Sequence, residues 1–141
     1  MYKEAIRPVW AEINLSNLDY NIKNIKAKLG SGTKIIGVVK ADGSVKVAEV
    51  LRANGVDTFA VSTLQEAIVL REAGAAEQII SLSLTPDFYS SVLVEYDITP
   101  VISSLENARA ISKTAAEVGK TVSGFIAADT GMGRIGYLTW D

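Results

Sequence analysis

The sequence contains neither cysteine nor histidine, and the two absences exclude several kinds of chemistry. Without cysteine there is no disulfide scaffold, no cysteine-ligated metal and no cysteine nucleophile. Without histidine, the chain lacks the commonest general base and the commonest metal ligand, so we expect no metal site. The chain is therefore either a protein that uses a cofactor or a purely structural one.

A strong charge of one sign and long apolar runs are also missing. Fourteen Lys and Arg oppose 16 Asp and Glu, and the resulting net charge of −2 argues against a nucleic-acid partner. No uncharged apolar run approaches the roughly 18 residues of a membrane span. The N-terminal segment MYKEAIRPVWAEI lacks the apolar core of a signal peptide. We therefore expect a soluble, cytoplasmic protein without a membrane partner.

Short β-rich runs alternate with helical stretches along the whole sequence. In the first helical stretch, apolar residues recur at spacings of three and four from Leu15 to Leu29, which gives one apolar helix face. Such alternation predicts an α/β fold with parallel strands joined by right-handed crossovers. The predicted strands are residues 9–14, 34–40, 58–62, 78–82, 98–103 and 121–128.

Polar residues and glycines mark the expected helix ends. A hydroxyl residue with an acidic residue three positions later predicts a capping box, and a glycine after a helical run predicts a left-handed C-terminal cap. The expected capping boxes begin at Ser16, Thr63 and Ser103, and the expected C-terminal caps are Gly30, Gly55, Gly74 and Gly119.

The αβ units recur about every 20 residues, a rhythm that fits a (β/α) barrel. An eight-stranded barrel takes roughly 250 residues, so 141 residues would hold about half of one. A doubly wound parallel sheet fits the same pattern. The rhythm alone leaves both architectures open.

Lys40 stands at the carboxyl end of an apolar predicted strand, where α/β folds place their active sites. A lysine there can form a Schiff base with an aldehyde cofactor if its amine is partly neutral. Taken alone, Lys40 is better explained as a side chain that leaves the sheet to reach water.

A glycine-rich segment, ADTGMGRIG, follows the last predicted strand. Its three glycines let the backbone turn tightly near a ligand, and Arg134 offers a fork of donors for a carboxylate, phosphate or phenolate oxygen. The spacing matches neither a Walker loop nor Gly-x-Gly-x-x-Gly. A surface turn with a solvated arginine explains it equally well. The two segments gain weight together, because both follow strands of one predicted barrel and so face one mouth.

Five segments together resemble bacterial alanine racemase, in the same order and with similar spacing over nearly the whole chain. The combination of Val-Lys-Ala-Asp with Thr-Gly-Met-Gly-Arg is highly specific. The segments are WAEINLSNLDYN (10–21), VVKAD (38–42), AVSTLQEA (60–67), LREAG (70–74) and DTGMGRIG (129–136).

The resemblance implies the N-terminal part of a (β/α)₈ TIM-type barrel of fold-type III pyridoxal-phosphate enzymes. Residues 1–14 would be an N-terminal strand segment that joins a separate C-terminal β domain, which these 141 residues lack. Residues 15–141 would be a partial barrel, the pyridoxal-phosphate-binding domain.

The resemblance also implies roles for individual residues. Lys40 would carry pyridoxal 5'-phosphate and act as the base on the D-alanine face. Arg134 would contact the phenolic oxygen of the cofactor and the substrate carboxylate, and Met132 would contact the substrate. The opposing tyrosine base would come from the second subunit of a homodimer. The complete enzyme would interconvert L-alanine and D-alanine and so supply D-alanine for peptidoglycan. The 141 residues alone, which lack that base, are expected to be inactive.

The sequence departs from the family in two places. The family continues Lys-Ala-Asp with Ala-Tyr-Gly-His-Gly, whereas Asp42 is followed directly by Gly-Ser-Val. About four residues are missing, either by deletion or because the sequence holds only ordered residues, and we favour the second. The family often has a lysine two residues before the aspartate of Asp-Thr-Gly-Met-Gly-Arg, where this chain has Ala127.

Three other functions stay open. One is a related racemase with a wider amino-acid range. Another is a single-domain pyridoxal-phosphate-binding homeostasis protein, which shares the barrel and the lysine but is not a racemase. The last is a purely structural α/β piece. The motifs at 10–21 and 130–134 favour alanine racemase.

Overall fold

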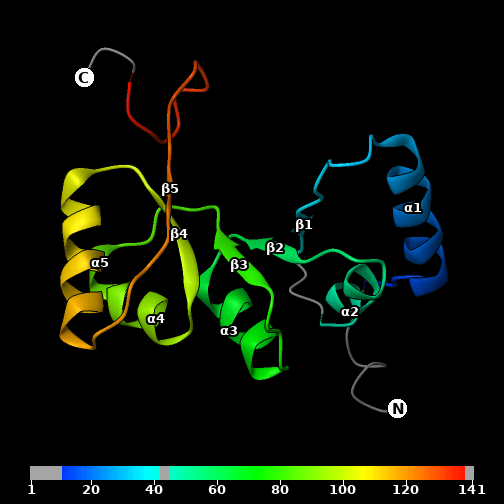
Figure 1. The fold of residues 1–141 in the computed structure, drawn as a ribbon, viewed down its shortest axis with the longest axis horizontal. Coiled ribbons are helices and arrows are strands. Elements are labelled where there is room, and N and C mark those ends of the chain that lie inside the picture. The colour runs from blue at the N-terminus through cyan, green and yellow to red at the C-terminus, as the bar shows by residue number, and fades with distance from the viewer. Residues whose placement is uncertain (1–10, 42–44, 139–141) are drawn as a thin grey trace.

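A computed structural model of the chain describes residues 11–41 and 45–138. Helices and strands alternate through these ranges, and Figure 1 shows their arrangement. The elements are α1 (Leu15–Lys28), β1 (Gly37–Val38), α2 (Val45–Ala53), β2 (Thr58–Val61), α3 (Leu64–Glu72), β3 (Gln78–Ser81), a 3₁₀ turn η1 (Asp87–Tyr89), α4 (Ser90–Glu95), β4 (Ile98–Ile102), α5 (Leu105–Glu117) and β5 (Phe125–Ile126).

The strands form a parallel sheet, as predicted, and their order in it is β1-β2-β3-β4-β5. The register aligns Phe59 of β2 with Gly37 of β1 on one side and with Ile79 of β3 on the other. Figure 1 shows β1 at the edge near α1 and α2, and β5 at the opposite edge. Because all strands run the same way, their carboxyl ends lie along one edge of the sheet.

The hydrophobic core lies between the central strands and the helices that cover them. Its largest fully buried apolar side chains are Phe59, Leu70, Ile79, Leu93 and Ile98. Burying a side chain of this size contributes about 1.5–3 kcal/mol. Most positions of the three central strands are buried, as apolar runs in a helix-covered parallel sheet predict.

Gly37 lets β1 pack closely against this core. A Cβ at this position would lie 2.9 Å from Cδ1 of Leu51 and 3.1 Å from Cδ1 of Phe59. A larger residue would force the Leu51 and Phe59 side chains to shift, so glycine allows β1 to lie this close to the core. This position lies three residues before Lys40, and the close packing therefore fixes the strand that leads to it.

The edge strands are shorter than predicted, whereas the ends of the central strands differ from the prediction by a single residue. β1 and β5 each have two residues, against the predicted 34–40 and 121–128. An edge strand has one neighbour, so fewer of its residues pair. The strand expected at 9–14 is partly outside the described residues, and residues 11–14 form no strand.

The helix ends agree with the sequence in part. The capping box of Thr63 and Glu66 is present. The other two predicted caps were wrong, because α1 is capped by Asn14 rather than Ser16, and α5 by Ser104 rather than Ser103. Positive φ angles confirm three of the four predicted glycine caps, those at Gly55, Gly74 and Gly119. The predicted cap at Gly30 was wrong, because the residue that caps the C-terminus of α1 is Leu29, in an extended conformation.

Candidate functional site

Lys40 lies just beyond the carboxyl end of β1. The buried Val39 before it donates its backbone N–H to the carbonyl of Ala60, 2.9 Å away, and so anchors the chain to β2. The side chain of Lys40 is exposed and has no hydrogen bond or ion pair with any residue that the structure describes. Its amine is therefore accessible from solvent.

The backbone turns sharply directly after Lys40. Ala41 has a φ of 70°, in the left-handed region that non-glycine residues rarely adopt. Its N–H donates to Oε1 of Glu66, at 2.7 Å, across 25 residues of sequence. Glu66 thus joins the residue after Lys40 to the start of α3. The sequence predicts Glu66 only as the acidic residue of the capping box that begins at Thr63 and does not predict its bond to Ala41.

The carboxylate of Glu66 accepts three backbone N–H groups in all. Oε2 takes those of Ser62 and Thr63, at 2.8 and 3.0 Å, while Oε1 takes that of Ala41. Partial burial on its own would raise the pKa of Glu66, but these N–H donors favour the charged form and lower its pKa below the usual 4.5. Glu66 is therefore an anion at neutral pH, with hydrogen bonds to both segments.

The second predicted segment forms a closed loop after β5. Oδ1 of Asp129 accepts the N–H groups of Gly131 and Gly133, at 2.9 and 3.1 Å. These backbone bonds lower the pKa of Asp129. The backbone N–H of Asp129 donates to Tyr137, and that of Tyr137 donates to Ala127, which brings the two ends of the loop together.

Gly136 is required for this closure. Its φ is 118°, and a Cβ there would lie 2.8 Å from the backbone N of Asp129. The closed loop presents Arg134 and Met132 to solvent, the latter with 77% of its surface exposed. Within the described part of the chain, Arg134 has no hydrogen bond or ion pair.

Lys40 follows the carboxyl end of β1 and Arg134 lies in the loop after β5, and these two strands are at opposite edges of the sheet. Four inter-strand spacings of ~4.8 Å separate such edges by about 19 Å in a flat sheet. The five strands leave the sheet open, so the structure does not bring these two side chains into contact. In a closed eight-stranded barrel, the first and fifth strands face each other across the mouth.

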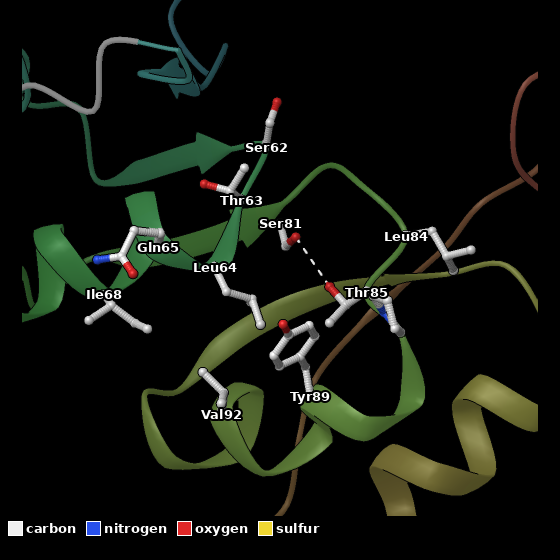
Figure 2. A pocket seen from close by; sticks show the side chains of 11 residues that line it. Ser62, Thr63, Leu64, Gln65, Ile68, Ser81, Leu84, Thr85, Tyr89 and Val92 are labelled. Carbon is white, nitrogen blue, oxygen red and sulfur yellow. Dashed lines mark hydrogen bonds between the residues drawn. The ribbon is translucent and has the colours of Figure 1, made fainter.

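A pocket of about 380 Å³ lies at the carboxyl ends of the central strands β2 and β3. Figure 2 shows it between the start of α3 and the η1–α4 segment, with Tyr89 directed toward Leu64 and Val92. Hydroxyl groups of Ser81 and Thr85 face each other at 3.5 Å. Neither Lys40 nor Arg134 lines this pocket.

Residues 42–44, which follow Lys40 and Ala41, lie outside the described residues. The departure from the family after Asp42 therefore stays an expectation from sequence. No helix in the described ranges is long and apolar enough to cross a membrane.

Comparison with known proteins identifies relatives over nearly the whole chain. A sequence profile of the family described as "Alanine racemase, N-terminal domain" matches residues 13–141. An alanine racemase of Clostridium kluyveri is 46% identical over 138 residues, which cover 95% of this chain and 35% of that protein. The chain therefore spans about a third of that relative's length.

Solved structures show the same fold. The structure of Clostridium difficile 630 alanine racemase in complex with cycloserine matches with a TM-score of 0.89 and 39% identity, over 94% of this chain and 38% of that one. A histidine racemase of Leuconostoc mesenteroides matches with a TM-score of 0.78 and 30% identity, over 88% of this chain and 34% of that one. The parallel sheet is thus part of a (β/α)₈ barrel, which decides between the two architectures that the sequence left open.

Proposed function

The chain belongs to the alanine racemase family, and from this premise we propose that it supplies the cofactor lysine of an enzyme that interconverts L-alanine and D-alanine. The observation that carries the proposal is the exposed amine of Lys40, which lies just beyond the carboxyl end of β1 and has no hydrogen bond or ion pair to the residues that the structure describes. Its position suits an active site of a barrel, since these sites lie at the carboxyl ends of the strands.

The donor groups fit pyridoxal 5'-phosphate. The primary amine of Lys40 can bond an aldehyde carbon, and the guanidinium of Arg134 can donate to a phenolate or carboxylate oxygen. The loop closed by Asp129 presents Arg134 with its donors unoccupied among the described residues. When bound, the cofactor withdraws electrons from the α-carbon of an amino acid and makes its proton acidic.

The protein then has to move one proton at the α-carbon. Lys40 is the base on one face, and racemisation needs a second base on the other face. We assign that base to the partner subunit of a homodimer, because the chain has no histidine and its tyrosines lie outside the family's catalytic tyrosine context. Arg134 holds the substrate carboxylate, and Met132 packs against the substrate beside it. The site of this reaction is the cytoplasm.

A racemase with a wider amino-acid range is the second candidate. The likeness to a histidine racemase at 30% identity supports it, because the same barrel then serves a much larger side chain in a relative. A pyridoxal-phosphate-binding homeostasis protein would hold the cofactor but would leave the configuration of amino acids unchanged.

The experiment is a racemisation assay on two polypeptides: the 141-residue chain and the full-length protein that contains it. Each is incubated with pyridoxal phosphate and with L-alanine or L-histidine, and the D-enantiomer is measured. We expect D-alanine from the full-length protein and none above free cofactor from the 141 residues. Equal rates on histidine would favour the wider-range racemase. Cofactor binding without any D-amino acid would favour the homeostasis protein.

A further inference from the structure

We propose that Glu66 is a positioning residue for Lys40, acting through the backbone of Ala41. This proposal rests on the function proposed above, in which Lys40 carries the cofactor. It adds a residue that touches neither cofactor nor substrate and that lies on a different αβ unit from Lys40.

Capping explains only some of the three backbone bonds made by the carboxylate of Glu66. A capping box needs one bond from the side chain back to the backbone at the helix start. Oε2 of Glu66 already accepts the N–H groups of Ser62 and Thr63. Oε1 is left over, and it accepts the N–H of Ala41, at 2.7 Å. That bond adds nothing to the cap of α3, so it serves the segment that contains Lys40.

The backbone conformation of Ala41 also requires support from its neighbours. A left-handed φ of 70° is unfavourable for alanine and persists only where the surroundings hold it. The neighbours that hold it are visible on both sides: Val39 is bonded to β2, and Ala41 is bonded to Glu66. Lys40 lies between these two anchors, so the backbone is held on both sides of it while its side chain is exposed.

The negative charge of Glu66 strengthens its hydrogen bond with Ala41. The pKa of Glu66 is lowered, so Glu66 accepts these bonds as a carboxylate, and charge-assisted hydrogen bonds are stronger than neutral ones. A glutamine has the same shape but one oxygen and one NH₂ group, and the NH₂ group cannot accept. Glu66→Gln therefore cannot satisfy Ala41 together with both N–H groups at the start of α3.

Thr63→Ala provides the matched control. Oγ1 of Thr63 accepts the N–H of Glu66, and this half of the capping box is lost on substitution. The backbone N–H of Thr63 remains, so the carboxylate keeps its three donors, including Ala41. Both variants weaken the start of α3, but only Glu66→Gln loosens the backbone beside Lys40.

The test uses the full-length protein as wild type, Glu66→Gln and Thr63→Ala. The measurements are the dissociation constant for pyridoxal phosphate, followed by absorbance, kcat at saturating cofactor, and the unfolding midpoint. We expect Glu66→Gln to weaken cofactor binding about tenfold and to lower kcat, as loss of a hydrogen bond to a charged group predicts. Thr63→Ala should stay within about twofold of wild type in both, while its unfolding midpoint falls.

The outcomes separate this proposal from the one on which it rests. Borohydride reduction should leave a phosphopyridoxyl group on Lys40 of the wild type. Its absence there would overturn both proposals. Its presence, with cofactor affinity and kcat of Glu66→Gln equal to those of Thr63→Ala, would overturn the positioning role alone and reduce Glu66 to a helix cap.

Discussion

Arg71 of α3 provides the sharpest test of how the αβ units are held together. Its guanidinium donates to four backbone carbonyls at 2.7–2.8 Å, two in the segment before β3 and two before β4. The acceptors are Ala75, Glu77, Tyr96 and Asp97. One side chain thus fixes two successive turns, including Asp97, whose φ of 50° is unfavourable without such support.

Substitution of Arg71 by alanine should therefore be costly. Hydrogen bonds to a charged group contribute about 1.5–3 kcal/mol each, but water can replace part of this at partly exposed carbonyls. We expect a loss of about 3 kcal/mol of unfolding free energy, or roughly 6–12 °C in Tm for a domain of this size. Arg71→Lys should lose about half as much, because a single ammonium group cannot reach all four carbonyls.

The assay is urea unfolding followed by circular dichroism, with Arg109→Ala as the matched control. Arg109 is exposed on α5 and makes no hydrogen bond or ion pair within the described ranges. Its removal should change stability by less than about 0.5 kcal/mol. If Arg71→Ala costs no more than Arg109→Ala at an unchanged m value, the four bonds do not hold the units together.

Two further predictions concern pH and loop closure. Arg52 forms a two-bond ion pair with Glu77 and lowers the pKa of that carboxyl below 4.5, so its stabilisation is present above pH 4.5 and is lost as pH falls through the lowered pKa. Arg52→Ala should cost about 1 kcal/mol at pH 7 and less at pH 3, and an equal cost at both would contradict this. Gly136→Ala should open the loop that carries Arg134, because its Cβ would collide with the backbone of Asp129. Faster hydrogen exchange at the Gly131 and Gly133 amides would reveal this, and unchanged exchange would refute it.

The central part of the fold could be predicted from local pattern, whereas the edges could not. Continuous apolar runs gave β2, β3 and β4 to within one residue, because buried parallel strands leave that signal. β1 and β5 have the same composition, but their length depends on neighbours that the run itself does not reveal. The short helix α4 has only six residues, too few to show a helical period in the sequence.

The same contrast applies to the site. Lys40 and Arg134 were recognised because each follows a predicted strand and falls in a family motif. Their positions at carboxyl ends agree with the structure, while their roles stay predictions. The bond between Glu66 and Ala41 joins residues 25 positions apart in different units, and no periodic pattern encodes such a contact. The sequence also could not show that Asn14 rather than Ser16 caps α1, since both residue types can cap a helix.

The central claim is that Lys40 is the residue that bonds pyridoxal phosphate, and chemical mapping tests it most directly. The full-length protein is loaded with cofactor, reduced with borohydride, digested and analysed by mass spectrometry, with Lys40→Ala and the exposed Lys46→Ala as paired variants. We predict a phosphopyridoxyl group on the peptide containing Lys40, its loss in Lys40→Ala and its retention in Lys46→Ala. A phosphopyridoxyl group on another lysine, with none on Lys40, would contradict the account.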